Sequence, residues 1–230
     1  MNIQDNNIFI ILPAFNEAQN ISATLNDLLK YNYQIIVVDD GSKDNTSELA
    51  KKFSVKILRH EINRGQGAAL ATGTIYALKN GAEIIAHFDA DGQFLAEEIS
   101  LLIEPIIKDQ ADIVLGTRFH TNQKISTNSK MPWLKRKIIH PCARFLNYFF
   151  TGLKLTDVHC GLRAMNRLAA EKIQIYQDGM AHNTEIVAQI KKQHLRYQEI
   201  PATVIYKKFG QGIGGGIRIL KELIISKIIN

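Results

Sequence analysis

The sequence predicts an α/β protein whose central sheet is mostly parallel and is covered by helices on both faces. Two observations support this fold class. Five short segments are apolar at nearly every position, as expected for strands buried on both faces, and segments with helical spacing separate them. The chain has 230 residues, of which 46% are hydrophobic, so it has ample material for one sizeable core.

The predicted elements alternate along the first half of the chain. The expected strands are residues 8–12, 34–38, 55–58, 83–87 and 111–116. Helical patterns follow the first four of them and begin near Asn16, near Ser42 or Asp44, at Ala68 and at Leu95. Pro13 is expected to end the first strand because it lacks a backbone N–H. A later run, residues 203–206, also resembles a strand.

Polar side chains gather directly after the first four strands. They are Asn16 and Glu17, Asp39 and Asp40, Asn63 and Arg64, and Asp89 and Asp91. The carboxyl ends of parallel strands meet at one edge of the sheet, which is where open α/β sheets bind ligands. Four such clusters on one edge predict a single binding site.

Asp89 and Asp91 form a pair of carboxylates one residue apart, where a strand ends. Carboxylates that converge there repel each other unless a cation lies between them, and oxygen ligands of this kind suit Mg²⁺ or Mn²⁺ shared with a substrate phosphate. A solvated acidic turn is the usual alternative for an isolated pair. The three neighbouring polar clusters favour the metal site.

The net charge of +6 is concentrated in one segment. Between Thr117 and Leu155 there are eight Lys and Arg residues and no Asp or Glu. This predicts an anionic partner: phosphate, lipid head groups or nucleic acid. Residues 132–151 combine a basic face with an apolar, aromatic one, which is typical of a helix on a membrane surface, although a helix covering the core shows the same periodicity. The lack of acidic residues favours membrane contact.

Other features exclude several classes. No apolar run reaches the ~18 residues that a membrane span needs. The two cysteines form no CxxC pair, and such sparse cysteine usage favours a reducing, cytoplasmic compartment. Residues 210–215 match GxGxxG, but a dinucleotide site needs a further strand and an acidic residue ~20 positions onward. That segment is therefore interpreted as a flexible loop.

Six segments, in this order along the chain, resemble those of family 2 glycosyltransferases with the GT-A fold. They are PAFNE at 13–17, VDDGSKDNT at 38–46, NRGQGAA at 63–69, DADGQ at 89–93, GTRF at 116–119 and TDVHCGLRA at 156–164. Within that family the chain resembles the dolichyl/polyprenyl-phosphate sugar synthases. The resemblance covers about residues 7–207 and argues against a nucleic-acid partner.

The resemblance implies one GT-A catalytic domain over residues 1–212. Residues 7–116 would form its nucleotide- and metal-binding half, and residues 117–212 its acceptor half, which includes the basic segment 132–151. Residues 213–230 would add an apolar and basic helix that packs on the domain, forms a homodimer or docks on a membrane. These three roles stay open.

The resemblance also implies roles for individual residues. The residues expected to bind the nucleotide sugar are Pro13, Phe15, Glu17, Asp39, Asp40, Arg64, Gly67 and Asp89. Among them, Asp39 and Asp40 would hold uracil or guanine and the ribose. Asp89 and Asp91, with Gln93 completing the shell, would bind the Mg²⁺ or Mn²⁺ ion that bridges the diphosphate.

The acceptor side leaves two chemistries open. Arg118 stands just past a strand, where its guanidinium can fork onto a phosphate. Asp157 and Glu185 are the candidate carboxylates beside the acceptor. A sugar hydroxyl must lose a proton to a positioned base, whereas a lipid phosphate is already an anion and needs orientation and charge neutralisation from groups such as Arg118 and Arg163.

The expected function is a metal-dependent, inverting transfer of a sugar from a UDP- or GDP-linked donor to polyprenyl phosphate. The protein would be cytoplasmic and peripheral at the inner face of the cell membrane. The alternatives are transfer to a saccharide hydroxyl in cell-envelope polysaccharide assembly, and nucleotide-sugar binding without turnover. A nucleotidyltransferase usually carries a glycine-rich Arg/Lys loop after its first strand, and this chain does not.

Overall fold

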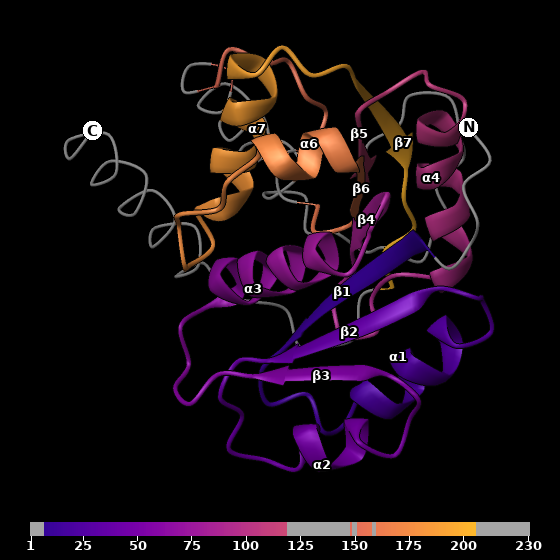
Figure 1. Ribbon diagram of the computed structural model, residues 1–230, viewed down its shortest axis with the longest axis vertical. Helices are drawn as coiled ribbons and strands as arrows, with labels where there is room; N and C mark the ends of the chain where they lie inside the picture. Colours follow the sequence, from indigo (N-terminus) through magenta and orange to yellow (C-terminus); the bar gives the residue numbers. More distant parts are fainter. Residues whose placement is uncertain (1–6, 119–147, 149–150, 158–159, 206–230) are drawn as a thin grey trace, which may run out of the picture.

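The computed structural model describes residues 7–118, 148, 151–157 and 160–205 (Figure 1). These residues build a seven-stranded sheet in the order β3-β2-β1-β4-β6-β5-β7. The strands are β1 (Ile8–Ala14), β2 (Gln34–Asp39), β3 (Lys56–Arg59), β4 (Ile84–His87), β5 (Ile113–Thr117), β6 (Arg163–Asn166) and β7 (Tyr197–Pro201). Only β6 runs antiparallel to its neighbours, so the predicted α/β fold with a mostly parallel sheet is confirmed.

Helices cover both faces of the sheet (Figure 1). Those packed on one face are α1 (Ile21–Leu28), α2 (Thr46–Ala50) and α4 (Ile99–Ile107), which follows the short 3₁₀ helix η2 (Ala96–Glu98). Those on the other face are α3 (Gln66–Lys79), α6 (Arg167–Lys172) and α7 (His182–Lys192). Side chains along β1 alternate between the two faces of the sheet. Ile10 and Leu12 pack in the core beneath α1, α2 and α4, and Phe9 and Ile11 pack in the core beneath α3, α6 and α7.

The carboxyl ends of the parallel strands share one edge of the sheet. Strand β6 begins at this edge, because Arg163 pairs with His87 of β4 and Leu115 of β5 in antiparallel register. Residues 160–162, which lead into β6, are therefore brought beside the loops that leave β4 and β5. This one reversed strand adds a segment from the second half of the chain to the edge where ligands are expected.

The first strand is longer than expected. It continues through Pro13 to Ala14, and both residues pair with β2. On its other side β4 pairs with β1 only as far as Ile11. Pro13 lies beyond the last residue of β1 that pairs with β4, so its missing N–H interrupts no hydrogen bond between these two strands.

Two strands in the second half differ from expectation. β6 was not predicted, because its sequence Arg-Ala-Met-Asn mixes charged, polar and apolar residues. The last strand is β7, Tyr197–Pro201, and not residues 203–206, of which 203–205 have no regular structure. All five residues of β7 are half-buried, as suits an edge strand, so they lack a continuous apolar pattern.

None of the helices in the described part of the chain has the length and apolarity needed to cross a membrane. The expected segments 132–151 and 213–230 and the loop 210–215 lie outside the described residues, apart from Tyr148 and Thr151. The division of the domain into a donor half and an acceptor half stays a prediction.

Candidate functional site

The loops that leave β1 and β2 form one hydrogen-bonded unit at the edge of the sheet. The backbone N–H of Asn16 donates to Oγ of Ser42 at 2.9 Å, and that of Glu17 donates to Oγ1 of Thr46 at 2.8 Å. In return, the N–H of Lys43 donates to Oδ1 of Asn16 at 2.9 Å. The polar residues after the first two strands are thus brought together, as predicted from their positions.

Of the other nucleotide-pocket candidates on β1, Pro13 is buried within the strand, and Phe15 lies just beyond it with 42% of its surface exposed. A partly exposed aromatic ring at a strand end is available to a ligand. Pro13 pairs with Val38 of β2, and its role in the nucleotide pocket stays a prediction, as does that of Phe15.

Asp39 at the end of β2 is completely buried. Its Oδ1 accepts a hydrogen bond from the N–H of Ser42 at 2.9 Å. Its Oδ2 has no hydrogen-bond partner among the described residues, although Nε of Arg59 lies 3.5 Å away. A buried acceptor without a partner is costly, so this oxygen is suited to an N–H group of a ligand.

Asp40 organises the loop that precedes α3. Its oxygens accept from the N–H groups of Arg64 at 3.0 Å and Gly65 at 2.7 Å and from Nδ2 of Asn63 at 2.9 Å, and Oδ1 lies 2.7 Å from Nδ1 of His60. These contacts give Asp40 a structural role in addition to the predicted one, because they link the end of β2 to the first turn of α3.

The first turn of α3 is covered by the segment before α7. The N–H of Gly67 donates to the carbonyl of Asp178 at 2.8 Å, and a Cβ at position 67 would overlap the carbonyl oxygen of Gln177. The guanidinium of Arg64 also lies 3.4 Å from the Asp178 carboxylate. Close packing therefore requires glycine at position 67. At this helix N-terminus the N–H groups of Gly67 and Ala68 donate to the carbonyl of Asp178.

Glu185 holds the covering segment in place. Its Oε2 accepts from the N–H groups of Tyr176 and Gln177, both at 3.0 Å, and burial raises the pKa of its carboxyl group. The structure thus gives this predicted catalytic carboxylate a clear positioning role in the loop over α3. Its role as a base stays a prediction.

Asp89 is held from two sides. Nε2 of Gln66, in the first turn of α3, donates to Oδ1 of Asp89 at 2.7 Å. On the other side, a Cβ at position 161 would overlap Oδ2 of Asp89, so only glycine allows the segment before β6 to approach so closely. Burial and the charge of Asp91 raise the pKa of Asp89 to about 6.

Burial is the larger cause of this raised pKa, and the charge of Asp91 adds to it, so a cation beside the two carboxylates would be favourable. The described residues contain no group of three or more His, Cys, Asp or Glu side chains that could hold a metal. Two carboxylates completed by substrate phosphates are, however, the usual ligand set of Mg²⁺. The two carboxylates are of the chemical type that fits this ion, and their role as its protein ligands stays a prediction. Gln93 contributes its backbone to this loop, donating its N–H to Oδ1 of Asp91 at 3.0 Å.

Arg163 is 2% exposed and its charge interacts with that of Asp89. It donates to the carbonyl of Cys160 at 3.3 Å and to Oδ1 of Asn183, and its charge opposes the rise in the pKa of Asp89. A side chain this deeply buried cannot reach an acceptor phosphate. The structure thus places Arg163 in the interior, where its charge acts on Asp89, and not at the exposed acceptor side where the sequence placed it.

Arg118 and Asp157 form a two-pronged ion pair just beyond β5. Nε of Arg118 donates to Oδ2 of Asp157 at 2.5 Å, and Nη2 donates to Oδ1 at 2.8 Å. The backbone N–H of Arg118 also donates to Oδ2, at 3.1 Å. Asp157 is buried, whereas 21% of the Arg118 side chain is exposed. The two residues that were predicted for the acceptor side therefore belong to one unit, of which the Arg118 side chain is partly exposed.

Sequence reasoning missed two supporting side chains, Gln66 and Glu199. Gln66 lies within the quoted motif NRGQGAA, which was a usable signal. Glu199 in β7 accepts hydrogen bonds from the turn that carries Asp157, and nothing in its local sequence indicates this contact.

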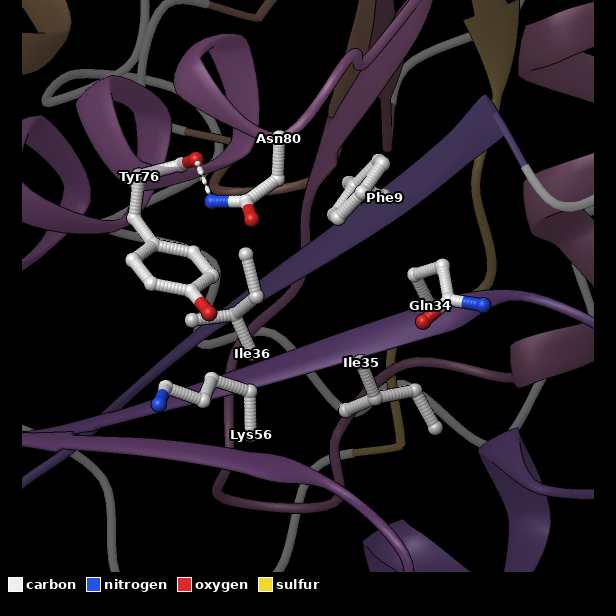
Figure 2. A pocket seen from close by; sticks show the side chains of 7 residues that line it. All are labelled: Phe9, Gln34, Ile35, Ile36, Lys56, Tyr76 and Asn80. Carbon is white, nitrogen blue, oxygen red and sulfur yellow. Dashed lines mark hydrogen bonds between the residues drawn. The ribbon is translucent and has the colours of Figure 1, made fainter.

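A pocket of about 270 Å³ lies away from this edge (Figure 2). Gln34 and Lys56, which line it, are the first residues of β2 and β3, whereas the candidate site follows the last residues of the strands. The pocket is therefore separate from the candidate site.

Comparison with known proteins gives consistent results. The model of Glycosyl transferase family 2 matches residues 9–174. An uncharacterized protein of Methanocaldococcus jannaschii is 38% identical over 233 residues, which cover 98% of this chain and 94% of the relative. A UDP-N-acetylglucosamine–dolichyl-phosphate N-acetylglucosaminyltransferase of Methanococcus voltae is 32% identical over 235 residues, which cover 94% and 92%.

Among solved structures, glucosyl-3-phosphoglycerate synthase from Mycobacterium tuberculosis, in complex with Mn²⁺, UDP and phosphoglyceric acid, is similar with a TM-score of 0.70. The match covers 95% of this chain and 76% of that structure at 15% sequence identity, so it shows a shared fold.

Proposed function

The chain belongs to glycosyl transferase family 2, and on this premise we propose that it transfers a sugar from a UDP-linked donor to a polyprenyl phosphate. The family membership confirms the resemblance found in the sequence and makes the protein a glycosyltransferase. The observation that supports the acceptor is the two-pronged contact between Arg118 and Asp157.

A general base must offer an oxygen to the proton that it removes. Both oxygens of Asp157 accept hydrogen bonds from the Arg118 guanidinium, so protonation of Asp157 would disrupt the pair. Asp157 is thus better suited to orienting Arg118 than to deprotonating a hydroxyl. A phosphate acceptor needs no deprotonation, and an oriented guanidinium on a partly exposed side chain suits its geometry.

The donor base is proposed from Asp39 and Arg59. Uracil presents one N–H between two carbonyls, which suits one acceptor oxygen with a cationic donor beside it. Asp39 offers Oδ2 in this way, next to Nε of Arg59. Guanine presents two adjacent N–H groups that pair best with both oxygens of a carboxylate, but Oδ1 already accepts from Ser42. The relative from Methanococcus voltae, named for a UDP-linked donor, supports this choice.

In the proposed reaction, an oxygen of the acceptor phosphate attacks the anomeric carbon from the face opposite UDP. The bond from that carbon to UDP breaks, the new carbon–oxygen bond forms, and the configuration inverts. Asp89 and Asp91 would hold Mg²⁺ or Mn²⁺, which when bound neutralises charge developing on the departing UDP. Arg118 binds and orients the acceptor. The basic segment 132–151 is proposed to place the protein at the cytoplasmic face of the membrane, where this acceptor resides.

The donor assignment predicts that UDP in the presence of Mn²⁺ binds more tightly than GDP, by about tenfold or more, since a hydrogen bond to a charged group contributes about 1.5–3 kcal/mol. In Asp39→Asn, Oδ1 must still accept from Ser42, so the amide N–H₂ would face the base. UDP affinity should then fall while CDP, whose N3 is an acceptor, is tolerated. Calorimetric titration measures both effects, and equal affinity for UDP and GDP would contradict the assignment.

The acceptor assignment predicts sugar transfer to farnesyl phosphate, a short polyprenyl phosphate, and not to free saccharides. Asp157→Asn should mainly raise KM for the phosphate acceptor, because Arg118 loses its partner. Loss of a general base would instead lower kcat by about 10²–10⁴-fold. Steady-state kinetics separate these outcomes. Product formed only with saccharides would favour the alternative function in cell-envelope polysaccharide assembly, and donor binding without any product would favour a binding protein.

A further inference from the structure

Glu199 lies in β7, an edge strand that pairs with β5 in parallel. Its register partner is Leu115, two residues before Thr117. Glu199 is half-buried and its carboxylate faces the turn at residues 156–157, more than forty residues earlier in the chain. No expected motif includes this residue.

The Glu199 carboxylate is a hydrogen-bond acceptor for the turn at residues 156–157. The N–H of Thr156 lies 2.9 Å from Oε1 and 3.1 Å from Oε2, and the Thr156 hydroxyl donates to Oε1 at 2.9 Å. The N–H of Asp157 also donates to Oε1, at 3.3 Å. Three donors from two consecutive residues thus converge on one carboxylate, which fixes the position of the turn.

The same turn is tied to the end of β5. The hydroxyls of Thr117 and Thr156 lie 2.6 Å apart. Because the Thr156 hydroxyl donates its proton to Glu199, it accepts from Thr117. The next residue on each segment forms the ion pair, Arg118 with Asp157. Glu199, Thr156 and Thr117 therefore hold the two segments in the register in which the ion pair forms.

We propose that Glu199 is a positioning residue of the acceptor site, acting through Thr156 and Asp157 on the guanidinium of Arg118. This inference rests on the proposed function, in which Arg118 binds the acceptor phosphate. Without the Glu199 carboxylate, two backbone N–H groups and a hydroxyl of the turn lose their acceptor. The turn then shifts, and the Asp157 carboxylate no longer holds Arg118 in one orientation.

The test compares Glu199→Gln with Glu98→Gln. Glu98 is a matched control because both of its carboxylate oxygens accept the backbone N–H of Thr203, at 3.0 and 2.9 Å, as those of Glu199 accept the N–H of Thr156. Glu199→Gln keeps Oε1 but removes the charge and turns an N–H₂ donor toward the Thr156 N–H in place of Oε2. With farnesyl phosphate as acceptor, the displaced turn should raise the acceptor KM by about tenfold. UDP affinity should stay unchanged. Glu98→Gln should leave both quantities unchanged.

A second pair of variants guards against misfolding. Thr156→Val removes the bridging hydroxyl with almost no change of shape and should raise the acceptor KM. Thr156→Ser keeps the hydroxyl and should keep the acceptor KM at the wild-type value. An unchanged acceptor KM in folded Glu199→Gln, or an equal loss of donor and acceptor binding, would overturn the inference.

Failure of the proposed function gives a different result, because wild-type protein would then neither bind nor glycosylate farnesyl phosphate. In that case the positioning role is tested by thermal unfolding of Glu199→Gln, Arg118→Gln and the double variant. Residues that share a network give non-additive shifts in Tm, which would support the positioning role. Additive shifts would reject it.

Discussion

Asp91→Asn is expected to abolish the Mn²⁺-dependent binding of UDP and, with it, sugar transfer. The substitution keeps the size of the side chain and its ability to accept from the N–H of Gln93, but it removes one of the two charges that we assign to the ion. Loss of a charged metal ligand at a site with two protein carboxylates should weaken UDP binding in Mn²⁺ by about 100-fold or more.

Calorimetric titration of UDP in Mn²⁺ and in EDTA measures this effect directly. Wild-type protein should show a large difference between the two conditions, and Asp91→Asn should show almost none. Glu97→Gln is the control, since it removes an exposed carboxylate six residues away in η2. If Asp91→Asn kept the wild-type difference between Mn²⁺ and EDTA, Asp91 would not be a ligand and the assignment of the carboxylate pair would be wrong.

The charge of Asp91 also explains why the pair is costly without an ion. Burial is the largest cause of the raised pKa of Asp89 and the charge of Asp91 adds to it, whereas Arg163 and the hydrogen bond from Gln66 act in the opposite direction. These supporting groups reduce the repulsion without removing it. The fold thus accepts an unfavourable arrangement at its edge, as expected where binding chemistry takes precedence over stability.

The strands at the centre of the sheet could be predicted from sequence because both of their faces are buried. β1, β2 and β4 are apolar at nearly every position, and their positions were predicted to within a few residues. β6 could not be predicted. Its first residue, Arg163, is a buried charge whose hydrogen-bond acceptors come from residues 160 and 183, and short strands of this kind depend on tertiary context.

The candidate site shows the same division. Residues that directly follow strands were predictable, because parallel strands bring their carboxyl ends to one edge whatever the loops do. Gln66 and Glu199 act through contacts with Asp89 and Thr156, and such pairings between distant segments follow from loop paths that a single sequence does not reveal. The sequence also could not show that Asp157 accepts two hydrogen bonds from the Arg118 guanidinium. The proposed orienting role of Asp157 rests on this contact.

Arg118→Lys is expected to lower kcat/KM for a polyprenyl phosphate by about 100-fold, or about 2.7 kcal/mol of transition-state stabilisation, while UDP binding is retained. The guanidinium uses two N–H groups to hold Asp157, and 21% of the Arg118 side chain is exposed. An ammonium group keeps the charge but lacks the planar fork, so it cannot hold the carboxylate and a phosphate in one fixed geometry.

Arg196→Lys is the matched control for this change. Arg196 makes a similar two-pronged contact with Asp112, with Nη2–Oδ1 at 2.9 Å and Nε–Oδ2 at 3.2 Å, but Asp112 precedes β5 and so lies at the opposite end of that strand. Its substitution should affect stability and not acceptor kinetics. A further measurement, slow hydrolysis of the UDP-sugar by water, should be unchanged in Arg118→Lys, because water needs no guanidinium. If hydrolysis and transfer fell together, Arg118 would belong to the donor site, and the case for a phosphate acceptor would lose its main support.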